Sequence, residues 1–253
     1  MRVHHRTDGA GRGLLLVNSL GSALELWEPQ VGPLAGRFRL VRFDQRGHGD
    51  TPAPQGPYTI EELAGDALEL LDRIGLERVS ICGLSLGGAV ATWLAANAPD
   101  RVDRLVIACA GSRFGTPDGW HERAAAVRAG GTEAVVDGVL ERWFTPAFAA
   151  ASPGVVAGFR AAFCAVNREG YAGCCEALAA WDASSHLGRI RAPTLVLSGS
   201  EDTVAPPDRG RAVAEGIAGA RFTIIEDAAH LASAGQPAAF TRAMLDHLTE
   251  EAR

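Results

Sequence analysis

A serine framed by two glycines is the feature that most constrains how this chain can fold. Ser85 follows an apolar run and precedes an alanine-rich, helix-forming segment at 89–98. The spacing Gly-x-Ser-x-Gly between a strand and a helix predicts a sharp reversal that holds the serine in a strained backbone conformation. Gly83 and Gly87 carry no Cβ, so strand and helix can approach closely. We interpret Ser85 as a nucleophile at a helix N-terminus, where negative charge is favoured.

The rest of the chain alternates strand-like and helix-like segments, which is typical of a parallel sheet covered by helices on both faces. Apolar runs of strand length occur at 14–17, 38–43, 79–83, 104–108, 194–198 and 222–225. Apolar positions at helical spacing predict a helix over 60–74, and further helices are expected at about 207–217 and 237–248. The pattern therefore predicts an α/β fold.

Residues 113–187 interrupt this alternation. The segment is rich in alanine, punctuated by glycine and proline, and contains no clear strand. An insertion here would lie over the carboxyl ends of the strands, where open α/β sheets place their ligand crevice. We therefore expect residues 1–112 and 188–253 to form a core and residues 113–187 to form a helical cap with an apolar underside.

Composition excludes several classes of partner. The net charge of −6 comes with no basic run, so nucleic acid is not expected as a partner. No apolar stretch approaches the ~18 residues that span a bilayer, and the N-terminus lacks the apolar core of a signal peptide, so we expect a cytoplasmic protein without a membrane partner. The five cysteines should then be reduced. Cys174 and Cys175 lack the spacing and partner histidines of a metal site and are interpreted as packing.

A serine hydroxyl becomes reactive when a neighbouring base takes its proton. His230 follows the last predicted strand by a short loop, where its imidazole can reach the serine. The acid is expected in the turn after the strand at 194–198. We favour Asp202 over the adjacent Glu201, because only one carboxylate can orient the imidazole. A helix-capping aspartate is the alternative interpretation of Asp202. The sequence thus predicts a triad of Ser85, His230 and Asp202.

Acyl transfer also needs two backbone N–H groups aimed at the developing oxyanion. One is expected from Leu86, directly after the nucleophile, and the other from Leu20, in the loop after the first predicted strand. A further glycine-rich loop contains Asp44, Arg46 and His48. We interpret its polar groups as mostly structural, holding a tight turn below the site.

Together these motifs resemble the α/β-hydrolase superfamily over nearly the whole chain. The motifs are Asn18 to Gly21, Asp44-x-Arg46-Gly47-His48-Gly49, Gly83 to Gly88, Asp202 and His230. Cap segments at 123–131, 141–148 and 170–175, with Asn-Ser-Leu-Gly in place of the common His-Gly, resemble the 3-oxoadipate enol-lactonases of aromatic catabolism.

The resemblance implies the α/β-hydrolase fold, with a mostly parallel sheet, helices on both faces and a helical cap. Because only about a dozen residues precede the first clear strand, the N-terminal hairpin is expected to be shortened. The resemblance also implies hydrolysis of a small carboxylated enol-lactone in the β-ketoadipate pathway through an acyl-enzyme, with no metal or organic cofactor.

A carboxylated substrate should face a cation, and the planar fork of arginine suits that role. Arg113, Arg123, Arg128 and Arg142 are the candidates; Arg123 and Arg128 are taken as predicted contacts. Each could instead be solvated or paired with a nearby acid. Trp143 is predicted as an apolar wall, with packing of cap against core as its alternative.

Two other functions remain open on the sequence. One is a different serine hydrolase of the same fold, such as an esterase, a C–C bond hydrolase or a cofactor-free perhydrolase. The other is a ligand receptor that keeps the fold without turnover. The oligomeric state, including a homodimer, is also open.

Overall fold

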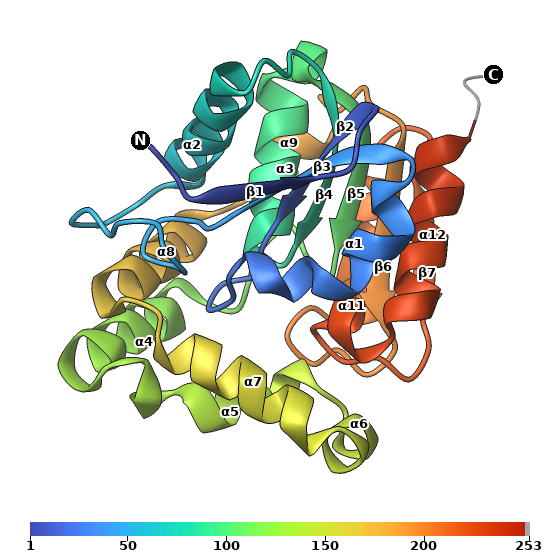
Figure 1. Cartoon of the computed structure of the whole chain (residues 1–253). Coiled ribbons are helices and arrows are strands. Elements are labelled where there is room, and N and C mark those ends of the chain that lie inside the picture. The colour runs from blue at the N-terminus through green and yellow to red at the C-terminus, as the bar shows by residue number, and fades with distance from the viewer. Residues whose placement is uncertain (251–253) are drawn as a thin grey trace.

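The computed structural model describes residues 1–250, which form one seven-stranded sheet in the order β1-β3-β2-β4-β5-β6-β7 (Figure 1). Every neighbouring pair of strands is parallel except β1 with β3. The carboxyl ends of six strands therefore share one edge of the sheet. The strands are β1 (His5–Asp8), β2 (Arg12–Val17), β3 (Phe38–Phe43), β4 (Val79–Leu84), β5 (Val102–Ala108), β6 (Thr194–Gly199) and β7 (Arg221–Ile225).

The central strands are buried on both faces. Every residue of β4 and β6 is buried, as is all of β2 after its first residue. Helices α1 (Glu28–Ala35) and α12 (Pro237–Thr249) pack together on one face, whereas α2 (Ile60–Arg73) and α3 (Leu86–Asn97) pack together on the other (Figure 1). This two-sided cover explains why the strands read as continuous apolar runs.

Helix boundaries follow local chemistry. Helix α2 begins at a capping box in which the Thr59 hydroxyl accepts the Glu62 N–H and the Glu62 carboxylate accepts the Thr59 N–H. It ends just before Gly75, whose φ of 71° favours glycine. The predicted helix over 60–74 is therefore found within one residue. Helix α10 (Pro207–Glu215) starts with proline in its first turn, as α12 does.

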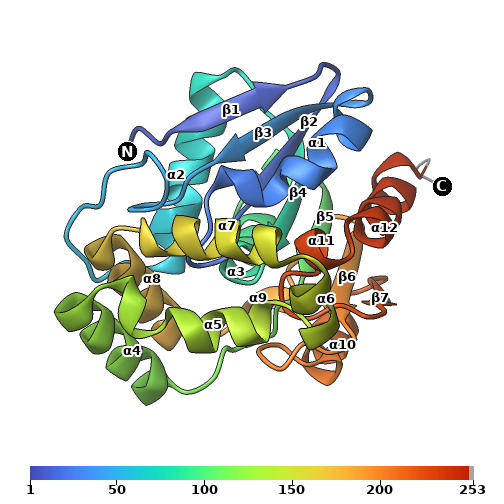
Figure 2. The same cartoon turned by 60° about the horizontal axis from the view of Figure 1, so that its bottom comes forward.

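Most of the chain between β5 and β6 forms a layer of helices across the carboxyl edge of the sheet, which we call the cap (Figure 2). Aromatic rings pack along its inner side: Phe163 lies edge-on to Trp143 at 5.5 Å and to Tyr171 at 5.3 Å between centroids. The cap comprises α4 (Pro117–Gly130), η3 (Thr132–Ala134), α5 (Val136–Trp143), α6 (Pro146–Ala151), α7 (Pro153–Cys164) and α8 (Arg168–Ala180). The short helix α9 (Ser184–Leu187) follows the cap and packs against α3.

The sequence pattern did not reveal strand β1. Its four residues, His-Arg-Thr-Asp, are half-buried or exposed and form no apolar run, so periodicity carries no signal there. The strand pairs antiparallel to β3 at the edge of the sheet. Within residues 1–250, no helix has both the length and the apolar character needed to cross a bilayer.

Candidate active site

The tight turn between β4 and α3 places Ser85 at the carboxyl edge of the sheet. Ser85 has φ 57° and ψ −114°, a backbone conformation that residues other than glycine rarely adopt. A Cβ on Gly83 would lie 2.0 Å from the Gly87 carbonyl oxygen, and one on Gly87 would lie 2.1 Å from the Val17 carbonyl oxygen. The glycines on both sides of the serine are therefore required by close backbone packing.

Three side chains from distant parts of the chain form a hydrogen-bonded series. Ser85 Oγ lies 2.8 Å from His230 Nε2, and His230 Nδ1 lies 2.9 Å from Asp202 Oδ2. The other oxygen of Asp202 accepts the N–H groups of Val204 at 2.8 Å and Ala205 at 3.0 Å. These bonds aim Oδ2 at the imidazole.

All three members of the series are buried, whereas the adjacent Glu201 is exposed. With Nδ1–H donating to Asp202, the lone pair of Nε2 faces the serine hydroxyl. A hydroxyl held in this way can give up its proton as it attacks an electrophilic carbon.

The two predicted oxyanion donors are Leu86, directly after the serine in the chain, and Leu20, in the loop after β2. Leu86 is the first residue of α3, so its N–H has no partner within the helix. Leu20 follows β2 and lines the same cavity as Ser85. The Asn18 carbonyl accepts a hydrogen bond from the Gln45 side chain at 2.9 Å, and Asn18 Nδ2 donates to the Phe43 carbonyl at 2.8 Å. These bonds fix the start of the loop that carries Leu20.

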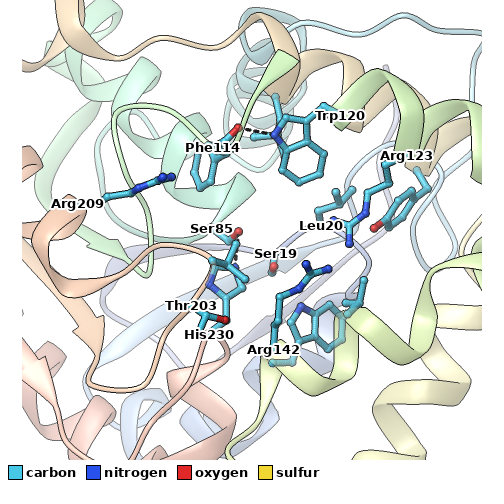
Figure 3. A pocket seen from close by; sticks show the side chains of 16 residues that line it. Ser19, Leu20, Ser85, Phe114, Trp120, Arg123, Arg142, Thr203, Arg209 and His230 are labelled. Carbon is cyan, nitrogen blue, oxygen red and sulfur yellow. Dashed lines mark hydrogen bonds between the residues drawn. The ribbon is translucent and has the colours of Figure 1, made fainter. Parts of the chain in front are cut away.

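A cavity of about 260 Å³ separates the cap from the sheet edge and contains Ser85 and His230 in its wall (Figure 3). Its size suits a small molecule. Most of its apolar lining comes from the chain between β5 and β6, including the predicted wall residue Trp143, and the rest comes from Leu20 and Val204. The lining side chains are Ser19, Leu20, Ser85, Phe114, Trp120, Arg123, Val139, Arg142, Trp143, Tyr171, Leu178, Thr203, Val204, Arg209 and His230.

Three arginines face this cavity. Arg123 and Arg142 approach from the cap, and Arg209 lies on the other side of Ser85 in the view of Figure 3. Within residues 1–250, none of the three has a carboxylate within 4.0 Å. Partial burial, followed by the neighbouring charge of Arg123, lowers the pKa of the Arg142 guanidinium. The cavity thus gathers positive charge that the described protein does not neutralise.

Arg128, the other predicted contact, does not line the cavity. Its guanidinium binds Glu169 at 2.9 Å and Glu176 at 2.6 Å, which ties α4 to α8. The prediction failed because two acids more than 40 positions away in the chain come together only in the fold.

Arg209 was missed by sequence reasoning, which looked for cations only in the cap. It lies in the first turn of α10, shortly after the turn that delivers Asp202. That proximity in the chain is the signal that could have found it.

The cap and the histidine loop are joined by main-chain hydrogen bonds. The His230 N–H donates to the Arg142 carbonyl at 3.3 Å, and the Leu231 N–H donates to the Trp143 carbonyl at 3.0 Å. The end of α5 thereby places Arg142 and holds the imidazole loop at once. Among residues 1–250, no group of three or more His, Cys, Asp or Glu side chains is arranged to hold a metal ion.

Comparison with known proteins decides the family. A model of the alpha/beta hydrolase fold matches residues 14–154, which is more than half of the chain. The chain belongs to the α/β-hydrolase family. This α/β hydrolase is 35% identical to 3-oxoadipate enol-lactonase 2 of Acinetobacter baylyi over 91% of its own length and 86% of that protein. It is also 31% identical to the proposed carbamate hydrolase RutD of Azorhizobium caulinodans, over 96% of this chain and 93% of RutD.

Among solved structures, the enol-lactonase from Burkholderia xenovorans LB400 superimposes on this α/β hydrolase with a TM-score of 0.96. The two sequences are 42% identical, and the match covers 98% of this chain and 96% of the other. The predicted fold class and the resemblance to enol-lactonases are therefore confirmed. So is the prediction that the protein is an enzyme, a hydrolase acting on ester or lactone bonds.

Proposed function

We propose that this protein is a serine hydrolase that opens a small carboxylated enol-lactone of the 3-oxoadipate type. One observation carries the proposal: Ser85 and His230 of the bonded series Ser85–His230–Asp202 lie in the wall of a small cavity that also holds arginines without carboxylate partners among residues 1–250. The similarity to enol-lactonases over most of the chain supports the choice of substrate class.

In the first half of the reaction, His230 Nε2 takes the Ser85 hydroxyl proton while Oγ attacks the ring carbonyl carbon. The carbonyl oxygen becomes an oxyanion, and the N–H groups of Leu20 and Leu86 donate hydrogen bonds that stabilise the developing charge. The tetrahedral intermediate collapses, the bond to the ring oxygen breaks, and the proton on His230 passes to that oxygen. The opened chain stays on Ser85 as an ester, and the enol formed at its other end relaxes to a ketone, which discourages re-closure.

In the second half, a water molecule attacks the acyl carbon and gives its proton to His230. The bond to Oγ then breaks, and Ser85 recovers its proton as the new carboxylate forms. Asp202 keeps the imidazole in the orientation with Nδ1–H toward the carboxylate and stabilises the positive charge that forms on the ring in each half. The chemistry balances with the substrate and water alone, so no step calls for a metal or an organic cofactor.

The arginines account for the substrate carboxylate. Arg123 and Arg142 lie on the cap side of the cavity and can present N–H groups to a carboxylate while the lactone carbonyl faces Ser85. Charge-assisted hydrogen bonds of this kind are stronger than neutral ones and favour an anion over a neutral ester of equal size. Trp143 and the neighbouring cap side chains would cover the apolar part of the ring.

The test compares the enol-lactone with a neutral aryl ester of similar size. We expect kcat/KM for the lactone to exceed that for the ester by about a hundredfold, since each charged hydrogen bond is worth about 1.5–3 kcal/mol. Ser85→Ala serves as the control for uncatalysed opening of the lactone. Rapid hydrolysis of neutral esters with no turnover of the lactone would overturn the proposal.

The similarity to RutD supports a second candidate, a hydrolase of small carbamates or esters. A carbamate substrate in the same panel distinguishes the two, because a neutral carbamate makes no use of unpaired arginines. Tight binding of an enol-lactone or of its hydrolysis product without turnover would instead favour a receptor. The lactonase proposal also carries a place in the β-ketoadipate pathway and a cytoplasmic location.

A further inference from the structure

The loop at 43–51 contacts the segment that carries Leu20 at both of its ends. At the start, the Phe43 carbonyl and the Gln45 side chain hold Asn18. At the far end, Asp44 Oδ1 accepts the Leu24 N–H at 2.8 Å. The middle of the segment, where Leu20 itself lies, is a turn closed by the Ser22 N–H and hydroxyl on the Ser19 carbonyl, and these local bonds do not anchor the turn to the rest of the fold.

His48 supplies that anchor. Its Nε2 accepts the Gly21 N–H at 2.9 Å, and its Nδ1–H donates to the Arg46 carbonyl at 2.9 Å. The imidazole is fully buried. An acceptor at Nε2 and a donor at Nδ1 together define one neutral tautomer, with the proton on Nδ1. Burial lowers the pKa of His48, which keeps the acceptor available.

Gly21 also packs against the cap. Its φ is 82°, and a Cβ there would lie 2.4 Å from the Phe163 ring and 3.3 Å from Tyr171. Gly21 is therefore held by His48 through its N–H and by the aromatic rings of α7 and α8, which pack closely against its Cα. With the peptide between Leu20 and Gly21 fixed, the backbone of Leu20 has little freedom to rotate.

We propose that His48 is a positioning residue for the oxyanion site: its Nε2 fixes the peptide after Leu20, so that the Leu20 N–H stays aimed at the oxygen that becomes negative. The inference rests on the proposed function, since it assumes acyl transfer through Ser85. Oxyanion donors are effective because they are already oriented when charge develops. Loosening the peptide should therefore weaken binding of the transition state more than binding of the substrate.

Two substitutions separate the hydrogen bond from the bulk of the ring. In His48→Gln, the side-chain oxygen can reach the position of Nε2 and accept the Gly21 N–H. In His48→Asn, the shorter amide reaches the position of Nδ1 and leaves Gly21 without an acceptor. If His48→Asn does not fold, His48→Met replaces it, because it fills similar space without a nitrogen or oxygen acceptor. Thermal unfolding verifies that each variant is folded at the assay temperature.

Two readouts avoid dependence on the natural substrate. One is kcat and KM with p-nitrophenyl acetate; the other is the rate at which a fluorophosphonate labels Ser85, a reaction in which Oγ bonds to phosphorus and fluoride leaves. We expect His48→Asn to lower kcat and the labelling rate by about ten- to hundredfold with KM within about threefold, which is less than the loss of a whole oxyanion donor. His48→Gln should stay within about threefold of the wild type in both.

The outcomes are distinct. If the wild-type protein reacts with the fluorophosphonate and the variant lacking the acceptor reacts equally fast, the role of His48 is wrong and the proposed nucleophile stands. Equal losses in His48→Gln and the acceptor-free variant would also overturn the inference, because bulk and not the acceptor would then matter. A wild-type protein that is not labelled overturns the nucleophile and this inference together.

Discussion

At the scale of single residues, the bonded series Ser85–His230–Asp202 makes the sharpest prediction. Ser85→Ala and His230→Ala should each lower kcat by about three orders of magnitude or more with little change in thermal stability, because the members of such a series act as a unit. Steady-state kinetics and thermal melts on the two variants provide the measurement. A loss below about tenfold for either variant would contradict the assignment.

The arginines of the cavity make a second prediction at this scale. Arg142→Gln should raise KM for a carboxylated substrate by about ten- to hundredfold and leave KM for a neutral ester nearly unchanged, because only the anion loses charged hydrogen bonds. Arg128→Gln is the matched control: it removes an arginine from the same cap but outside the cavity. Equal effects of the two substitutions on the carboxylated substrate would argue against Arg142 as a contact.

How much could be predicted from the sequence also differs between residues. Ser85, Asp202 and His230 lie at points where strand, turn and helix signals agree, and the structure brings the three side chains together. Arg128 could not be placed, because its partners are distant in the chain and sequence spacing says nothing about them. Arg209 was missed for a similar reason, since only the fold shows which surface residues of α10 face the cavity.

At the scale of elements, glycines in α3 and α2 should respond in opposite ways to alanine. Gly87→Ala places a Cβ 2.1 Å from the Val17 carbonyl oxygen, and backbone atoms cannot move aside. We expect a loss of more than about 3 kcal/mol in the free energy of unfolding. Gly65→Ala in α2 meets nothing within 4 Å and should gain roughly 0.5–1 kcal/mol. Urea titrations of both variants give the measurement, and similar free energies for the two would show that the elbow packs less closely than described.

The elements also show which strands the hydrophobic pattern of the sequence can predict and which it cannot. The strands of the sheet interior were predicted within two residues of their observed bounds, because burial on both faces leaves an uninterrupted apolar run. Strand β1 was not predicted, because an edge strand with exposed polar side chains has no such run. The other edge strand, β7, was predicted because it keeps the apolar residues Phe222, Ile224 and Ile225, whereas β1 can be recognised only through its pairing with β3.

At the scale of the whole molecule, stability should decline in mild acid through His247. This imidazole is buried, its Nδ1 accepts from Arg221 at 3.0 Å, and burial followed by nearby arginines lowers its pKa to about 4. Since the unfolded chain takes up the proton near pH 6.5 and the folded protein does not, the free energy of unfolding should fall by about 1.4 kcal/mol per pH unit between 6.5 and 4.

Substitution of His247 isolates this contribution. His247→Gln should reduce the slope of unfolding free energy against pH by the amount that corresponds to uptake of about one proton. The contribution of His48, whose pKa is also lowered, remains in the variant. Denaturant unfolding at several pH values between 4 and 7 measures the slope of each protein. Identical slopes for wild type and variant would show that His247 takes up its proton in the folded state.

The bonds from His230 and Leu231 to the carbonyls of Arg142 and Trp143 restrict how molecules enter and leave. If the cap opened as a rigid body, either these main-chain hydrogen bonds would break at every turnover or His230 would move away from Ser85. Substrate and product should therefore pass through an opening that needs no movement of the cap, with only small rotations of the side chains around it. Molecules too large for that opening are then excluded before they reach Ser85.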